Sequence, residues 1–139
     1  MQVNIRKDAG YAVLIRDYPD DRAFYARFMT EGSYDSGGPY RELFDSICTE
    51  LMSPVLPLLI PSPNQTSEFG ELRNCWLLNY GCNNQDLFEF LGVLVGYAIR
   101  STSPLLLDLH PIIWKQINGT KLTEEDLKSS DLYRYQMLE

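Results

Sequence analysis

The segment Pro39–Met52, PYRELFDSICTELM, has the clearest secondary-structure pattern in this 139-residue sequence. Its apolar residues recur at steps of three and four, the spacing of one face of an α-helix. They are Tyr40, Leu43, Phe44, Ile47, Cys48, Leu51 and Met52. Pro39 suits the first turn of a helix, because its missing N–H would have no partner there. The pattern predicts an amphipathic helix that begins near Pro39 and ends close to Pro54.

A second segment, Leu87–Arg100 (LFEFLGVLVGYAIR), is apolar around nearly its whole helical circumference. Such a helix is typical of a buried position at the centre of a domain. Asn84 is a suitable N-cap, because its side chain can accept a hydrogen bond from a free backbone N–H. These features predict a buried central helix over about residues 85–100.

The remaining segments are shorter. Alternating side chains predict a strand over Ala23–Thr30, and Cys75–Tyr80 is also typical of a strand. Leu105–Leu109 is expected to be a short extended segment, and the polar stretch Pro61–Gly70 a loop.

Three short helices are expected near the end of the sequence. His110 and the proline after it open the first, and Gly119 stops it. Thr123 caps the second, whose first turn is acidic as the helix dipole favours, and Asp131 starts the third. The fold class is therefore α+β and helix-dominated, with a few short strands.

Composition and charge exclude several classes of function. The chain has 12 basic and 19 acidic residues, a net charge of −7, so a phosphate backbone would repel it and nucleic acid is not an expected partner. Leu87–Ile99 is too short to span a bilayer, and the N-terminus lacks the apolar core of a signal peptide. No membrane association is expected. Three cysteines, an odd number, are typical of free thiols in a reducing compartment, so the cytoplasm is expected, with the nucleus as a second compartment.

The sequence offers little material for catalysis. His110 is the one histidine, and its place at a helix start favours capping or packing. None of Cys48, Cys75 and Cys82 has the cationic neighbours that activate a thiol, and their spacing matches no zinc pattern. We therefore expect no catalytic residue, no metal site and no cofactor. Asn118 begins an Asn-Gly-Thr glycosylation pattern that, without a secretory signal, is interpreted as accidental.

At Asp35–Phe44 (DSGGPYRELF) the sequence resembles the HECT-type ubiquitin ligases, at the turn into the first main helix of their N-terminal lobe. Four further blocks follow in the same order. They are VLPLLIPSPNQ (Val55–Gln65), LFEFLGVLVGYAIR (Leu87–Arg100), PLLLDLHPIIWKQING (Pro104–Gly119) and KLTEEDLKSSD (Lys121–Asp131). The blocks cover residues 23–139 and are most similar to the HERC-like branch.

The resemblance implies a domain organisation. Residues 23–139 would form part of a HECT N-lobe, its large subdomain with a buried central helix, and residues 1–22 an atypical N-terminal segment. Family members carry the catalytic cysteine in a C-terminal lobe, which this sequence is expected to lack. None of the three cysteines here falls on the family's catalytic position. The chain by itself is therefore expected to be inactive.

The function that the resemblance implies is a scaffold for ubiquitin transfer. The complete HECT domain would take ubiquitin from a conjugating enzyme onto a C-lobe cysteine as a thioester and pass it to a substrate lysine. Its partners would be the conjugating enzyme, ubiquitin and a protein substrate. The alternative is a stand-alone, non-catalytic interaction domain derived from the N-lobe, which a stop codon after Glu139 would favour. An unrelated helical adaptor is a third, weaker interpretation.

The resemblance also points to two surfaces. Some family members hold ubiquitin on an N-lobe surface whose nearest positions here are Val55, Leu56, Leu58 and Phe88. Its typical aromatic residues are missing at the first two of these positions, and core packing is the alternative interpretation.

The resembling block around the first helix supplies the other implied positions. Within the GG-x-x-R-E block, Arg41 and Glu42 would border the cleft between lobes, with a salt bridge on the helix surface as the alternative. Asp35, Gly37, Gly38 and Pro39 would form the structural turn that leads into the helix. Apolar side chains between Asp131 and Glu139 are expected to be exposed, because later parts of a complete lobe would normally cover them.

Overall fold

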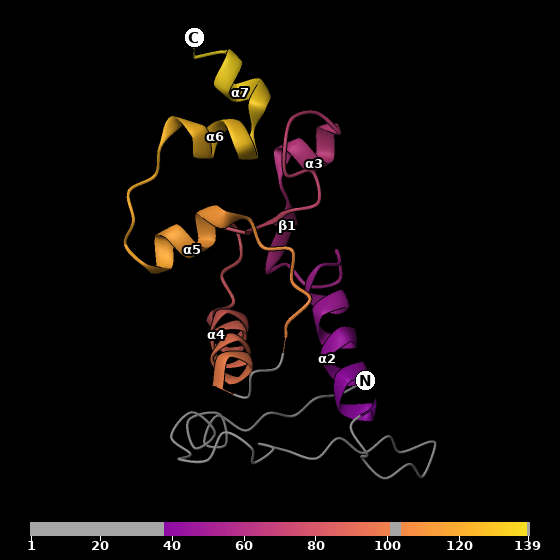
Figure 1. Ribbon diagram of the computed structural model, residues 1–139. Coiled ribbons are helices and arrows are strands. Elements are labelled where there is room, and N and C mark those ends of the chain that lie inside the picture. The colour runs from indigo at the N-terminus through magenta and orange to yellow at the C-terminus, as the bar shows by residue number, and fades with distance from the viewer. Residues whose placement is uncertain (1–37, 101–103, 139) are drawn as a thin grey trace. The chain divides into compact units, whose positions relative to one another are not determined.

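The computed structural model describes residues 38–100 and 104–138, which divide into two compact units (Figure 1). The first unit contains the described residues 38–48, 84–100 and 104–106, and the second contains residues 49–83 and 107–138. The predicted strand Ala23–Thr30, the turn residues Asp35 and Gly37, and residues 1–22 lie outside the described residues.

Helix α2 (Gly38–Leu51) confirms the first predicted helix, with Gly38 and Pro39 in its first turn. The predicted inner face is buried at Leu43, Phe44, Ile47, Cys48 and Leu51. The helix ends before Pro54, where the Ser53 hydroxyl donates a hydrogen bond to the Glu50 carbonyl at 2.6 Å. A free C-terminal carbonyl of α2 is satisfied in this way.

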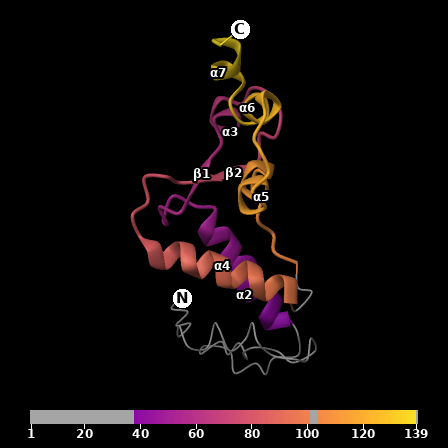
Figure 2. The ribbon, with the colours of Figure 1, turned by 90° about the vertical axis from the view of Figure 1, so that its left-hand side faces the viewer.

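Helix α4 (Gln85–Arg100) has the predicted bounds, and its Asn84 cap accepts a hydrogen bond from the Asp86 N–H at 3.1 Å. Within the first unit α4 crosses α2 (Figure 2), and the ring of Tyr97 stacks on Phe44 with centroids 5.6 Å apart. Aromatic stacking of this kind adds about 1 kcal/mol to the burial of the two rings.

The expectation that α4 is buried on all sides is wrong for this structure. Its buried side chains form one stripe, Leu91, Leu94, Tyr97 and Ala98, whereas Ile99 is 74% exposed. In the described part of the first unit α2 is the helix that packs on α4, and one neighbouring helix covers only one stripe. Apolar residues around the whole circumference of α4 therefore did not ensure that every side of the helix is buried.

The second unit is built on a small sheet. Strands β1 (Leu59–Pro61) and β2 (Trp76–Leu78) pair antiparallel, with Ile60 opposite Leu77. The other edge of β2 takes the predicted extended segment: the Trp76 N–H donates to the Asp108 carbonyl at 2.7 Å, and the N–H of His110 donates to the Trp76 carbonyl at 2.9 Å. These bonds fix where helix α5 (Pro111–Ile117) begins.

Helix α3 (Pro63–Ser67) occupies the stretch predicted to be a loop, so that prediction is wrong. Ser62 is its N-cap, and the hydroxyl of this completely buried residue accepts a hydrogen bond from the Gln65 N–H at 3.1 Å. The Ser62–Pro63 pair was the available signal, because a cap residue followed by proline is typical of a helix start. The helix is only five residues long, which made its periodicity undetectable.

The three predicted C-terminal helices are present: α5 (Pro111–Ile117), α6 (Glu124–Ser130) and α7 (Leu132–Gln136). Their predicted caps are confirmed. His110 Nδ1 accepts a hydrogen bond from the Ile112 N–H at 3.2 Å, and the Asp131 carboxylate accepts one from the Arg134 N–H at 3.0 Å. At the start of α6 the Asp126 carboxylate accepts hydrogen bonds from both the N–H and the hydroxyl of Thr123.

Asn64 joins α3 to the C-terminal helices through its side chain, which is 1% exposed. Its Nδ2 donates to the carbonyls of Glu71, Lys128 and Ser129 at 3.1, 3.2 and 2.8 Å. Its Oδ1 accepts from the Leu132 N–H at 2.8 Å, at the first residue of α7. One carboxamide thus holds the loop after α3, the end of α6 and the start of α7 together, and these helices lie side by side in Figures 1 and 2.

A second polar cluster connects α5 to α6. Lys115 Nζ lies 2.6 Å from Asp126 Oδ1, and the carboxylate is buried. The Lys115 ammonium, followed by the Thr123 backbone, lowers the pKa of Asp126. Burial lowers the pKa of His110, which the Ser129 backbone and the Asp126 charge partly oppose. Both groups therefore resist protonation in the folded chain.

Replacing Asn64 with alanine is expected to lower the free energy of unfolding by about 3 kcal/mol, because several buried backbone groups lose their partner together. Both tryptophans, Trp76 and Trp114, belong to the second unit, so their fluorescence during urea unfolding measures this change. The control is Asn83→Ala, an exposed asparagine of the same unit, with an expected change within about 0.5 kcal/mol. Equal effects of the two substitutions would contradict the role given to Asn64.

Stability of the second unit is expected to fall in two stages on acidification. The unfolded chain takes up a proton on His110 below about pH 6.5 that the folded chain resists. The stabilisation from Asp126 is complete above its unfolded pKa of about 3.9 and disappears as the pH falls toward the lower folded value. Urea midpoints measured by tryptophan fluorescence across this range test both stages.

The first stage has a clean control, because His110 is the one histidine of the chain. His110→Asn keeps a side-chain oxygen that can cap α5 but removes the titrating ring. The slope of stability between pH 7 and 5 should flatten in this variant; an unchanged slope would assign the effect to other groups.

Candidate functional site

The predicted ubiquitin-contact residues Val55 and Leu56 lie in the turn between α2 and β1. Val55 is 73% exposed, and its N–H donates to the Ser53 hydroxyl at 3.3 Å. On the other side of the turn Asn79 holds the chain, since its Nδ2 donates to the Pro57 carbonyl at 2.8 Å. The apolar Val55 side chain is therefore presented to solvent by a turn fixed at both ends.

The other two predicted contact residues have different surroundings. Leu58 is 0% exposed and belongs to the core of the second unit, so the structure supports the core-packing alternative for its side chain. Phe88 is half-buried in the first turn of α4 and belongs to the first unit. The exposed part of the predicted surface within the second unit is reduced to Val55 and the half-buried Leu56.

The predicted cleft residues Arg41 and Glu42 are both exposed near the start of α2. They flank the buried face formed by residues such as Leu43 and Phe44. Both are placed where a protein partner can reach them, and their role at a cleft stays a prediction.

The three cysteines are free, as expected, and two of them, Cys48 and Cys75, are buried. Cys48 is 1% and Cys75 is 7% exposed. Burial raises the pKa of both thiols, with a further contribution from Asp45 for Cys48 and from Asp108 for Cys75. The thiolate, which is the nucleophile in thioester chemistry, is thus disfavoured at both positions.

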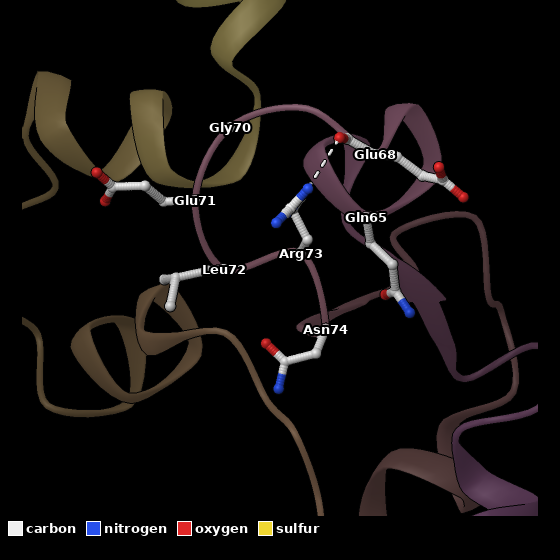
Figure 3. Close-up of a pocket in the computed structure, with 7 residues that line it drawn as sticks. All are labelled: Gln65, Glu68, Gly70, Glu71, Leu72, Arg73 and Asn74. Carbon is white, nitrogen blue, oxygen red and sulfur yellow. Dashed lines mark hydrogen bonds between the residues drawn. The ribbon is translucent and has the colours of Figure 1, made fainter.

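A shallow pocket lies on the second unit beside α3 (Figure 3). It is lined by Gln65, Glu68, Gly70, Glu71, Leu72, Arg73 and Asn74. Arg73 Nη1 donates to the Glu68 carbonyl at 3.2 Å across its rim. The side chains around it have mixed charge and amide groups, and they contain no nucleophile beside a base, so the geometry fits contact with a partner better than a reaction.

The loop around this pocket has an unusual backbone. Gly70 has φ 92°, and a Cβ added there would lie 2.7 Å from Asn64 Nδ2. Leu72 has φ 48°, a left-handed conformation that costs a bulky residue about 1–3 kcal/mol. The Asn64 bond to the Glu71 carbonyl and the Cys75 bond to the Leu72 carbonyl hold it in place. The sequence analysis predicted a loop as far as Gly70 but not its left-handed backbone, because such angles depend on the contacts of Asn64.

Apolar side chains are exposed on α7 and on the residues that directly follow it, as the sequence analysis predicted. Tyr133, Met137 and Leu138 are 55%, 83% and 74% exposed. The Tyr133 ring contacts Phe69 with centroids 5.2 Å apart, and Phe69 is itself 43% exposed. Exposed apolar groups of this size are typical of surfaces that contact other protein segments.

Two further classes of site are absent from the part of the chain that the structure describes. Within it, histidine, cysteine and carboxylate side chains do not gather in a group able to hold a metal ion. Of the helices described, none has both the length and the apolar character needed to cross a membrane.

Residues 45–139 match the family model described as HECT-domain (ubiquitin-transferase). The chain is 43% identical over 113 residues to the E3 ubiquitin-protein ligase HERC2 of Mus musculus, covering 79% of this chain and 2% of that protein. It is 36% identical over 119 residues to the probable E3 ubiquitin-protein ligase HECTD4 of Homo sapiens, covering 81% and 3%. It thus spans only a few per cent of the length of these relatives.

The matched region contains α4 and the whole described second unit, with its sheet and helices. The identity to HERC2 confirms the HERC-like character of the resemblance. The helix-dominated α+β fold, with its two-stranded sheet, agrees with a part of a HECT N-lobe. Over more than half of its length, therefore, this chain belongs to the HECT-domain (ubiquitin-transferase) family.

Proposed function

We propose that this chain acts as the N-lobe scaffold of a HECT-type ubiquitin ligase. The observation that carries the proposal is the family match over residues 45–139 in a chain whose Cys48 and Cys75 thiols are buried with raised pKa values. A scaffold role needs a folded surface, not an activated nucleophile. The proposed partners are a ubiquitin-conjugating enzyme, ubiquitin and a protein substrate, and the proposed compartment is the cytoplasm.

In the proposed reaction a C-lobe cysteine supplies the nucleophile. Its thiolate attacks the thioester carbonyl that links ubiquitin to the conjugating enzyme, and the enzyme's cysteine leaves as a thiolate. A substrate lysine amine then attacks the new thioester, releases the C-lobe thiol and forms an amide. The residues of this chain take no part in bond making; they hold the partners at the distance and angle that the two attacks require.

The exposed residues of the second unit support a surface for ubiquitin at Val55 and Leu56. Val55 is exposed and held in a fixed turn, which lowers the entropy cost of binding. Leu58, three positions later, is fully buried in the core of the second unit. A substitution at the exposed Val55 should affect binding, whereas one at the buried Leu58 should affect folding, so the two together allow a direct test.

A second candidate function is a non-catalytic protein-interaction domain. The exposed apolar groups on and directly after α7, with the neighbouring Phe69, favour it, because they suit contact with a protein whether or not ubiquitin is transferred. The mass of the native protein distinguishes the two functions, since the scaffold function requires a C-lobe in the same polypeptide.

Incubation of this 139-residue chain with ubiquitin-charged conjugating enzyme is expected to yield no thiol-sensitive ubiquitin adduct. A longer protein that contains these residues and a C-lobe should form one, and Cys82→Ser within it should leave the adduct unchanged. Gel analysis with and without reducing agent measures both. An adduct on the short chain that disappears in a Cys48, Cys75 or Cys82 variant would contradict the scaffold assignment.

Val55→Asp is expected to weaken ubiquitin binding by about tenfold with little change in stability, because it places a charge on an exposed apolar contact. Leu58→Ala should instead lower the free energy of unfolding by about 3 kcal/mol through loss of core packing. Chemical-shift titration of labelled ubiquitin measures binding, and urea unfolding measures stability.

The matched control is Met137→Asp, which adds the same charge at another highly exposed apolar residue of the second unit. It should leave the affinity for ubiquitin unchanged. Equal losses from Val55→Asp and Met137→Asp would indicate a general charge effect and remove the support for a specific surface.

A further inference from the structure

The pair Asn118–Gly119 lies at the end of α5 and is the only place in the 139-residue sequence where glycine follows asparagine. Both residues are exposed. A Cβ placed on Gly119 would meet no atom within 4 Å, so no neighbouring group shields the peptide bond between them. The pair therefore combines an accessible side-chain amide with the least hindered backbone nitrogen that can follow it.

We propose that Asn118 is a site of spontaneous deamidation. The backbone nitrogen of Gly119 attacks the Asn118 side-chain carbonyl and loses its proton to solvent. The side-chain amide nitrogen takes up one proton from solvent and leaves as ammonia. The result is a five-membered succinimide ring. Water then adds to either ring carbonyl and opens the ring, giving aspartate or isoaspartate at position 118. Water is the one co-reactant, and no oxidant or cofactor is needed.

The folded structure restrains this reaction. Asn118 has φ −82° and ψ 0°, and ring closure requires rotation about ψ to bring the Gly119 nitrogen beside the side chain. Two hydrogen bonds oppose the rotation: the Gly119 N–H donates to the Gln116 carbonyl at 3.2 Å, and the Thr120 N–H donates to the Lys115 carbonyl at 2.8 Å. The reaction must proceed from a state in which this helix end has opened.

Such opening is expected to be frequent, because α5 has seven residues and its last turn is exposed. Short helices are marginal without tertiary support, and their ends open at low free-energy cost. The buried side chain of α5, Ile113, lies near its start, far from Asn118. The rate of deamidation should therefore report the opening of this helix end.

The products would change the end of α5. A carboxylate at position 118 faces the negative end of the helix dipole, and isoaspartate also adds a methylene to the main chain. The connection to α6 starts here, and the Lys115–Asp126 ion pair spans it. Aged chains should consequently hold α5 and α6 together less firmly than fresh ones.

The test is incubation of the full chain at neutral pH in water enriched in oxygen-18, followed by trypsin and mass spectrometry. Cleavage after Lys115 and Lys121 isolates Gln116–Lys121, in which Asn118 is the one asparagine. We expect a gain of one mass unit for the amide-to-acid change and two more for the heavy oxygen, in two chromatographic peaks. Asn118→Gln should abolish the change in this peptide.

The tryptic peptide Asn74–Arg100 serves as an internal control, because its asparagines, Asn74, Asn79, Asn83 and Asn84, precede residues other than glycine. Unfolding in urea should accelerate the reaction at Asn118 about tenfold, which corresponds to about 1.4 kcal/mol for the two hydrogen bonds broken. The proposal would be overturned if the mass of Gln116–Lys121 increased no faster than that of the control peptide. It would also be overturned if aspartate formed without isoaspartate. An equal rate in urea would overturn the restraint by the helix end.

Discussion

The second unit depends on one buried carboxamide. Asn64 offers two N–H hydrogens and one oxygen, and the described structure uses all of them on backbone groups from three separate segments. With three carbonyls around two hydrogens, one hydrogen is shared between acceptors, an arrangement common at helix ends. Because the group is buried, losing any partner would leave an unsatisfied polar atom away from water. The end of α6 and the start of α7 are therefore fixed to α3.

This constraint also explains the backbone next to it. Gly70 approaches the Asn64 side chain so closely that any larger residue would collide with it. Leu72 accepts an unfavourable left-handed conformation in the same loop. The pocket in Figure 3 is the outer surface of this loop, and its shape follows from the buried amide. The shape of the surface that a partner could contact here thus depends on Asn64, which is buried and out of a partner's reach.

The distribution of reactive and exposed groups fits a scaffold. Buried polar residues such as His110 and Asp126 are engaged in capping and ion pairing, and the buried thiols are held in the neutral form. Apolar groups such as Val55 and Met137 are exposed instead. In this chain the internal groups hold the fold, and the surface carries the features that suit contact with other proteins.

Local features of the sequence determined the bounds and caps of most helices: the periodicity of α2, the Asn84 cap of α4, and His110, Thr123 and Asp131 before the C-terminal helices. The resemblance to the HECT family was also identified from the sequence. Local patterns sufficed here because capping and helical spacing involve residues within about four positions of each other.

Tertiary structure alone decided which predicted residues are buried. It placed Leu58 in the core and left Val55 in solvent, although both belong to one apolar run. It limited the burial of α4 to one stripe, and it brought Asn64 to partners more than sixty positions away. Burial and long-range hydrogen bonding depend on which elements pack together, and no pattern within a short window of sequence contains that information.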